Sequence, residues 1–160
     1  MTLAYVGIGS NLGEPAKQVE SAFEELGRIR QTSLVARSSL FRSQPVGYAD
    51  QPEFFNAVVA LETSLEPVEL LRELQVIEAR YGRRRSFPNA PRTLDLDLLL
   101  HGQAVVHRPE LTVPHPRMHQ RGFVLKPLLE IAPDIEIPGI GAAKARLGAC
   151  GDQRVEKIIG

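Results

Sequence analysis

The amino-acid sequence predicts an α+β fold whose elements follow the order strand, helix, strand, strand, helix, strand. Two observations support this order. Two segments carry apolar residues at helical spacing, and four short segments are rich in β-branched and aromatic residues or alternate apolar with polar ones. This is the order of the ferredoxin-like class. We therefore expect a ferredoxin-like βαββαβ core, with a single layer of helices on a mainly antiparallel sheet and with C-terminal additions.

Four segments are predicted to form the strands of the sheet. They lie at residues 3–8, 34–41, 54–61 and 94–100. The third is rich in aromatic and β-branched residues, which favour strands, and the second alternates apolar with small or polar residues. Between these two strands, two prolines and a glycine predict a loop at residues 43–52.

Two amphipathic helices are predicted between the strands. The first begins at Pro15 and ends at Gly27, because proline is favoured in a first helical turn and glycine just beyond the last one. Its apolar face consists of Val19, Ala22, Phe23 and Leu26. The second begins at Pro67 and is expected to stop at Gly82. Its apolar face consists of Leu70, Leu74, Ile77 and Tyr81.

The C-terminal third of the chain shows weaker patterns. Residues 111–116 are expected to be extended. Residues 121–131 have a helical pattern, which Pro127 is expected to divide into two short segments, because proline removes a hydrogen bond and clashes with the preceding turn. Residues 135–137 and 155–159 are expected to add short strands.

The composition is that of an ordinary globular protein, with 43% hydrophobic and 24% charged residues. Basic and acidic residues number 19 each, so the zero net charge gives no general attraction to nucleic acid or to an anionic membrane. No apolar run reaches the ~18 residues of a membrane span, no signal peptide is recognisable, and the single cysteine excludes an internal disulfide. We expect one domain over residues 1–160, in a cytoplasmic monomer that binds neither nucleic acid nor membrane.

The densest chemistry lies in the last predicted strand, where Asp95 and Asp97 alternate with leucines. Successive side chains of a strand point to opposite faces, so both carboxylates are expected on one face, with Leu96 and Leu98 on the other, toward the helices. Like charges this close repel each other, and a cation would offset the repulsion. Mg²⁺ prefers such oxygen ligands and completes its shell with phosphates and waters. An acid pair alone also fits an exposed strand start whose carboxylates meet only water or arginine.

An arginine-rich segment leads into the acid pair. Residues 80–92 contain several arginines and no acid. Taken alone, the segment is compatible with a solvated surface loop. Beside a metal site it suits phosphoryl transfer, because the metal polarises phosphate oxygens while arginine neutralises charge in the transition state. Glycine and prolines at its borders would also let it close over a substrate as a lid.

Several nucleotide and metal motifs are absent. The segment Gly7-Ile-Gly-Ser-Asn-Leu-Gly13 has leucine where a dinucleotide-binding turn needs its third glycine. There is no Walker A sequence, so any ATP is expected to be bound by side chains and lids. His115 and His119 do not predict zinc, since Pro116 prevents a helix that covers both. His115 fits a phosphate contact or a structural role, and Arg121 offers a further anion contact.

Five segments in order along the chain carry a family resemblance. They are Gly9-Ser-Asn-Leu12, Asp50-Gln-Pro-Glu-Phe-Phe-Asn56, Ala90-Pro-Arg-Thr-Leu-Asp-Leu-Asp97, Leu111-Thr-Val-Pro-His115 and Arg121-Gly-Phe123. Together they resemble the 6-hydroxymethyl-7,8-dihydropterin pyrophosphokinase family in its bacterial monofunctional form. The resemblance implies an Mg²⁺-dependent diphosphotransferase of folate biosynthesis, which moves a diphosphate from ATP to the pterin hydroxymethyl group and releases AMP.

The resemblance also implies roles for individual residues. Asp95 and Asp97 would coordinate two Mg²⁺ ions that bridge the ATP phosphates and the pterin hydroxymethyl oxygen. Arg83 and Arg92 would lie closest to the transferred group and act in catalysis. The residues that would hold ATP are Gln75, Glu78, Arg83, Arg85, Arg92, His115 and Arg121.

For the pterin, the resemblance implies an edge contact from Asn56 and a ring sandwich from Phe54 and Phe123. Backbone groups near the start of the 43–52 loop would complete the pocket, at Ser43, Pro45 and Val46. The residues themselves agree, because Phe54 and Asn56 share one face of their strand. An amide with aromatic walls suits a flat heterocycle with donor and acceptor edges.

The sequence departs from the family pattern at several positions. The chain has no tryptophan, whereas the family form has one over the pterin in the arginine-rich segment; Phe87 is the residue expected to replace it. Phe54 stands in place of a tyrosine, and Pro116 follows His115 in place of another tyrosine. Glu110 stands where an arginine near the adenine is expected.

Two other functions stay open from the residues. A ferredoxin-like binding or regulatory module without catalysis would explain the fold but leave the acid pair and the arginines without a purpose. An Mg²⁺-dependent nuclease or nucleotidyl transferase would use the same parts, but it calls for a basic face along a polymer, which the neutral net charge disfavours.

Overall fold

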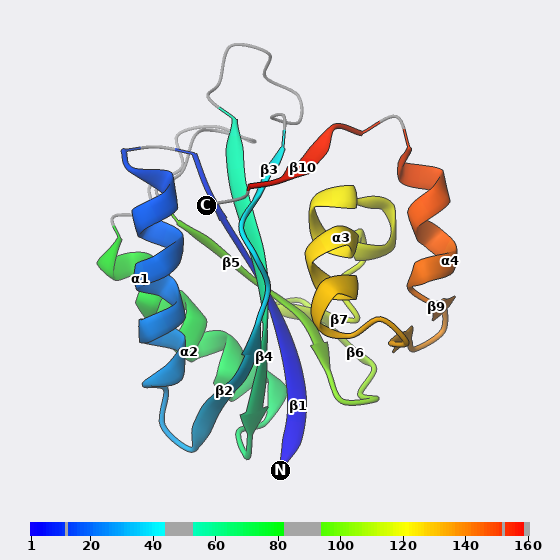
Figure 1. Cartoon of the computed structure of the whole chain (residues 1–160). Helices are drawn as coiled ribbons and strands as arrows, with labels where there is room; N and C mark the ends of the chain where they lie inside the picture. The colour runs from blue at the N-terminus through cyan, green and yellow to red at the C-terminus, as the bar shows by residue number, and fades with distance from the viewer. Residues whose placement is uncertain (12, 44–52, 82–93, 152, 159–160) are drawn as a thin grey trace.

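The computed structural model describes residues 1–11, 13–43, 53–81, 94–151 and 153–158. Its main sheet is antiparallel at every pairing within these residues, in the order β10-β3-β4-β1-β5, and β2 also pairs with β4 (Figure 1). The strands are β1 (Thr2–Ser10), β2 (Thr32–Arg37), β3 (Phe41–Ser43), β4 (Phe54–Thr63), β5 (Asp95–His101) and β10 (Val155–Lys157). The ferredoxin-like order of the first four predicted strands and two helices is confirmed.

Helices α1 (Pro15–Gly27) and α2 (Pro67–Arg80) cover one face of this sheet. Their predicted apolar faces are confirmed: Val19, Ala22, Phe23 and Leu26 of α1 and Leu70, Leu74 and Ile77 of α2 are buried. Tyr81 is partly buried at the end of α2, and Gly82, the expected stop signal, lies outside the described residues. Glu66 and Glu69 form a capping box that stabilises the first turn of α2.

The expectation of a single layer of helices requires correction. Helices α3 (Gly122–Ile131) and α4 (Lys144–Leu147) lie on the opposite side of the sheet from α1 and α2 (Figure 1). A second apolar core, which includes Val58, Leu99 and Leu125, fills the space on that side. The physical reason is visible in β4, where Ala57 to Leu61 are all buried. A continuous apolar run of this kind needs cover on both faces.

The single strand predicted at residues 34–41 is two strands in the structure, β2 and β3, both paired with β4. Ser38 lies between them. Its backbone N–H donates to the Val58 carbonyl and its hydroxyl accepts from the Val58 N–H, so a side chain takes over part of the ladder. The register of β2 against β4 also shifts between Leu34 and Ala36.

The prediction that Pro127 divides the 121–131 helix is wrong, because α3 runs without interruption from Gly122 to Ile131. Pro127 removes one backbone donor, but it is buried together with Val124, Leu125 and Leu128. Packing of this apolar face against the sheet stabilises the helix more than the single lost hydrogen bond weakens it.

Several short elements complete the fold. The strands predicted at residues 135–137 and 155–159 are confirmed as β8 (Glu136–Ile137) and β10, and β8 pairs with β9 (Gly141–Ala142). The extended segment predicted at 111–116 contains β7 (Leu111–Val113), which pairs with the unpredicted β6 (Val106–Arg108). Short 3-10 helices follow at η1 (Met118–Gln120) and η2 (Gly148–Cys150).

Among the described residues, no helix combines the length and the apolar character needed to cross a membrane.

Replacement of Gly102, which lies in the turn after β5, tests the packing of this turn against the start of β1. Gly102 has φ +57°, and an added Cβ would lie 2.7 Å from Cγ2 of Thr2. We expect Gly102→Ala to lower the free energy of unfolding by about 1–3 kcal/mol in urea titrations, because a left-handed backbone conformation and a clash add together.

Gly139 provides the matched control, since it has φ +78° but no atom within 4 Å of an added Cβ. Gly139→Ala should therefore cost less, and Thr2→Ser in the Gly102→Ala background should recover the difference. Equal losses at the two glycines would contradict the role of the clash.

Candidate functional site at the β1, β4 and β5 strands

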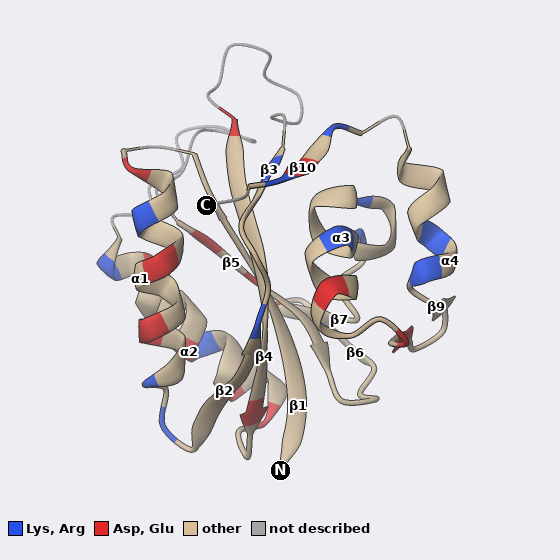
Figure 2. Ribbon diagram, in the orientation of Figure 1, with Lys and Arg blue, Asp and Glu red and all other residues tan. Residues whose placement is uncertain are grey.

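Strand β5 carries the two carboxylates as strand alternation predicts. Leu96 and Leu98 are 4% and 3% exposed and belong to the core under α1 and α2. Asp95 and Asp97 are half-buried on the other face. Figure 2 shows them as an acidic stretch of β5 beside strands that carry few charges. Within the described ranges, no group of three or more His, Cys, Asp or Glu side chains gathers as a metal site, so this pair is the acidic cluster to consider.

Two glycines of β1 lie directly beside the acid pair. Gly7 is opposite Asp97 and Gly9 is opposite Asp95 in the β1–β5 pairing. Gly9 is also opposite Asn56 in the β1–β4 pairing. Residues directly opposite each other in antiparallel strands share a sheet face. Asn56, Gly9 and Asp95 therefore form a row across three neighbouring strands, and the glycine leaves the space between the amide and the carboxylate open. Both glycines lie within a strand, which excludes the dinucleotide-binding turn.

The side-chain amide of Asn56, at one end of this row, is held in a defined orientation. Asn56 is 5% exposed, and the hydroxyl of buried Ser43 donates to its Oδ1 at 2.6 Å. This bond directs Nδ2 toward β1, where an added Cβ at Gly9 would lie 3.4 Å from that nitrogen and 3.8 Å from Cδ1 of Phe54. The structure thus brings Asn56 and Phe54 together over Gly9, on one strand face.

His115 lies on the loop after β7. Its backbone N–H donates to the Leu99 carbonyl at 2.9 Å, and its Nδ1 accepts from the Arg117 N–H at 3.3 Å. The pKa of His115 is lowered to about 4, chiefly by burial and also by the charges of Arg121 and Arg117, while the charge of Asp95 acts in the opposite direction. The imidazole is therefore neutral at physiological pH. Because Nδ1 accepts a hydrogen bond, Nε2 carries the proton and is available as a donor.

Arg121 and Phe123 lie side by side where α3 begins. The guanidinium carbon of Arg121 is 5.4 Å from the centre of the Phe123 ring, a cation–π distance. Of the positive charges that lower the pKa of His115, Arg121 has the largest effect. One short segment thus presents a cation toward His115 and an aromatic ring next to it.

Glu78 has a position that the sequence did not reveal. It is 4% exposed, and its Oε2 accepts a hydrogen bond of 2.8 Å from the backbone N–H of Leu96. Strand β5 is the last strand of the sheet order among the described residues, so this N–H faces away from β1, on the side where no described strand pairs with β5. The carboxylate therefore holds β5 between its two aspartates. Gln75 is exposed on α2, one turn before Glu78.

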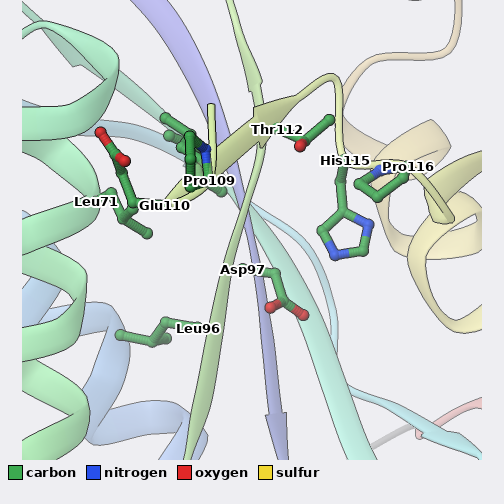
Figure 3. A pocket seen from close by; sticks show the side chains of 10 residues that line it. Leu71, Leu96, Asp97, Pro109, Glu110, Thr112, His115 and Pro116 are labelled. Carbon is green, nitrogen blue, oxygen red and sulfur yellow. The ribbon is translucent and has the colours of Figure 1, made fainter. Parts of the chain in front are cut away.

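A pocket of about 270 Å³ lies between α2, β5, the β6–β7 hairpin and the loop after β7 (Figure 3). Asp97 and His115 line one side of it, and Glu110 and Leu71 lie together on the other. Its apolar wall comes from α2, β5 and the β6–β7 hairpin, through Leu71, Leu96, Leu98, Pro109 and Leu111. A polar side followed by an apolar wall is the arrangement expected for a ligand with a charged end and a flat apolar end.

The structure brings together most of the predicted site residues that it describes. Asp95, Asp97, Ser43, Phe54 and Asn56 lie on or beside the open face of the row, and His115, Arg121 and Phe123 border it from the loop after β7 and from α3. Gln75 and Glu78 lie on α2, and the remaining predicted site residues lie outside the described ranges: Pro45, Val46, Arg83, Arg85, Phe87 and Arg92.

Comparison with known proteins identifies relatives over most of the chain. The model of a family described as 7,8-dihydro-6-hydroxymethylpterin-pyrophosphokinase (HPPK) matches residues 5–133. The chain is 46% identical over 156 residues to a 2-amino-4-hydroxy-6-hydroxymethyldihydropteridine pyrophosphokinase of Pseudomonas aeruginosa, which covers 98% of this chain and 96% of that protein. An enzyme of the same name from Haemophilus influenzae is 46% identical over 138 residues, 86% of each chain.

Similar solved structures support the fold. A crystal structure of Plasmodium falciparum HPPK-DHPS with pteroate has a TM-score of 0.74 at 12% identity, and the match covers 92% of this chain and 42% of that one. At this identity the likeness concerns the fold alone, and it confirms the ferredoxin-like class. The match to the family model and the identity to curated relatives go further: the chain belongs to the 7,8-dihydro-6-hydroxymethylpterin-pyrophosphokinase family and transfers diphosphate from ATP to the hydroxymethyl group of the pterin in folate biosynthesis.

Proposed function

We propose that the row of Asn56, Gly9 and Asp95 is where the pterin meets the transferred diphosphate, and this row is the observation that carries the assignment. Neighbouring strands lie about 4.8 Å apart, so the amide and the carboxylate are separated by about 10 Å across the sheet. That span fits a flat bicyclic ring whose edge is bound at Asn56 and whose hydroxymethyl group reaches the acid pair.

The fit of the acid pair to Mg²⁺ supports a metal role. Two half-buried carboxylates on one strand face offer hard oxygen ligands and leave room for phosphate oxygens and water, as Mg²⁺ requires. We assign Asp95 and Asp97 to two Mg²⁺ ions that bind with ATP. When bound, these ions would polarise phosphate oxygens and neutralise negative charge.

The pocket beside Asp97 is assigned to ATP. Its apolar wall suits the adenine, and the side with Asp97 and His115 suits the phosphates. The neutral His115 would donate from Nε2 to a phosphate oxygen, and Arg121 would add charge next to it. Gln75 and Glu78 on α2 are also assigned to ATP binding. Glu78 contributes through its hydrogen bond to the backbone of β5. Arg83, Arg85 and Arg92 are proposed to contact the phosphates, with Arg83 and Arg92 at the transferred group.

The pterin is assigned to the Asn56 end of the row. The Asn56 amide, oriented by Ser43, would read the donor and acceptor edge of the ring. Phe54 and Phe123 would sandwich its faces, and backbone groups at Ser43, Pro45 and Val46 would complete the pocket. Phe87 is proposed to cover the ring in place of tryptophan.

In this arrangement the pterin hydroxymethyl oxygen attacks the β-phosphorus of ATP and loses its proton to solvent. The bond between the β-phosphorus and the oxygen that bridges it to the α-phosphorus breaks, and AMP leaves with that oxygen. No side chain forms a covalent intermediate. The protein contributes by holding both substrates in line and by placing arginine charge where charge develops in the transition state. We also propose that the enzyme acts as a cytoplasmic monomer, which size-exclusion chromatography of the purified protein and fractionation of its source cells would test.

Direct assay tests the proposed reaction. With ATP, Mg²⁺ and 6-hydroxymethyl-7,8-dihydropterin we expect AMP to form in step with pterin diphosphate. Formation of ADP, or release of AMP without the pterin, would contradict the assignment.

Removal of one carboxylate tests the metal role. Asp97→Asn keeps the shape of the side chain but removes its charge, and we expect kcat to fall by about a thousandfold or more in saturating Mg²⁺. Asp134→Asn is the control, since Asp134 is 92% exposed and pairs only with Lys144 at 3.9 Å among its described contacts. Near wild-type turnover of Asp97→Asn would exclude Asp97 as a metal ligand.

A side chain at Gly9 tests the row itself. The Cβ of Gly9→Val would lie 3.4 Å from Asn56 Nδ2, and its methyl groups would fill the gap toward Asp95. We expect KM for the pterin to rise by about tenfold or more, while KM for ATP changes less. Gly148→Ala, where an added Cβ meets nothing within 4 Å, is the control. An unchanged KM for the pterin would place the ring elsewhere.

The lowered pKa of His115 predicts a pH dependence of stability in the substrate-free protein. Its folded pKa of about 4 lies below the ordinary value of 6.5, so the unfolded chain binds the proton more readily. Stability is therefore unaffected above pH 6.5 and is lost as the pH falls from 6.5 toward 4. We expect the thermal midpoint of the wild type to fall faster over this range than that of His115→Asn, whose Oδ1 can replace Nδ1 as acceptor for Arg117. Parallel curves would show that His115 is not buried as a neutral group.

A further inference from the structure

The C-terminal segment, beyond the residues 5–133 matched by the family model, returns to the site. Strand β10 pairs with β3, with Val155 opposite Ser43, the residue that orients Asn56. Figure 1 shows β10 crossing above the first turn of α3. This segment therefore lies against both the Asn56 end of the row and the helix that begins with Arg121 and Phe123.

Gln153 makes two hydrogen bonds that bracket Arg121. Its Oε1 accepts from the backbone N–H of Gly122 at 2.8 Å, and its Nε2 donates to the carbonyl of Gln120 at 2.8 Å. The first N–H groups of a helix have no partner within the helix. Arg121, the N-cap residue of α3, provides no side-chain cap. One amide from the C-terminal segment thus satisfies the backbone on both sides of Arg121.

The packing around Gly122 shows that the contact is close. An added Cβ at Gly122 would lie 3.3 Å from Val155 Cγ2, 3.4 Å from Gln153 Oε1 and 3.6 Å from Cys150 Cβ. Glycine at this position therefore lets the C-terminal segment approach the start of α3. Other bonds hold the segment further along the helix, from Lys126 Nζ to the Val155 carbonyl and between Lys157 and Glu130.

We propose that Gln153 is a positioning residue for the diphosphoryl transfer, acting through the backbone of Arg121 and Gly122. Fixing this backbone sets the direction of the Arg121 guanidinium toward the nucleotide phosphates. It also sets the first turn of α3, which carries the Phe123 ring that Arg121 contacts. The Gln153 amide thereby positions residues that bind both substrates. This inference rests on the proposed roles of Arg121 and Phe123.

The test compares Gln153→Met with Lys157→Met. Methionine has about the length of glutamine but lacks its donor and acceptor, so only the two bonds are lost. Lys157 holds the same segment through an ion pair with Glu130, near the other end of α3 from Arg121. We expect Gln153→Met to raise KM for both ATP and pterin by about threefold to tenfold, the effect of one to two neutral hydrogen bonds. Lys157→Met should leave both KM values within about twofold of wild type, although its thermal midpoint should be similar to that of Gln153→Met.

Arg121→Ala and Phe123→Ala are measured in parallel. If they leave KM for ATP and pterin unchanged, their proposed substrate roles are wrong. If they raise KM but Gln153→Met does not, the inference about Gln153 is overturned. A fall in activity shared by Gln153→Met and Lys157→Met, in step with the thermal midpoint, would reduce Gln153 to a structural contact and also overturn it.

Hydrogen exchange on the unaltered protein gives a second test that needs no variant to fold. The N–H of Gly122 should exchange more slowly than the N–H of an unbonded loop residue, because Gln153 accepts from it. Exchange at the rate of a free amide would contradict the bond on which the proposal depends.

Discussion

The registers of β1 against its two neighbours are the constraint on which the site depends. Each pairing is antiparallel, and each places a different polar side chain opposite Gly9: Asn56 from β4 and Asp95 from β5. A shift of either register by one residue would turn its polar side chain to the opposite face, into the core under α1 and α2. The apolar residues that alternate with them, Ala57 and Leu96, are 1% and 4% exposed, so burial itself holds the register.

One face of the sheet contributes to stability, and the other also carries the residues of the site. The face under α1 and α2 is a continuous apolar core. The other face is apolar where α3 covers it and polar at the row of Asn56, Gly9 and Asp95. Buried contacts from remote parts of the chain fix the borders of this polar region: Glu78 on the backbone between the aspartates, and Ser43 on the Asn56 amide. Such support is what holds reactive groups in one geometry.

Family membership settles questions that the residues left open. A non-catalytic module matched the fold, and a nuclease or nucleotidyl transferase matched the acid pair and the arginines, but the chain belongs to a pterin pyrophosphokinase family. Two of the departures of this chain from the family pattern, Glu110 and Pro116, line the pocket. Glu110 borders the apolar side of the pocket, away from Asp97 and His115, where its charge is far from the proposed phosphates.

Local patterns in the sequence were sufficient for the βαββαβ core and for the common face of Asp95 and Asp97, because helical and strand periodicity are properties of neighbouring residues. They also paired Phe54 with Asn56. They failed where distant contacts decide: Ser38 interrupts a strand through β4, and α3 stays whole across Pro127 because its apolar face is buried. The row across three strands, the carboxylate of Glu78 on Leu96 and the amide of Gln153 around Arg121 all join residues far apart in sequence. Only the tertiary structure decided them, since register and burial are set by packing between elements, and no single segment contains that information.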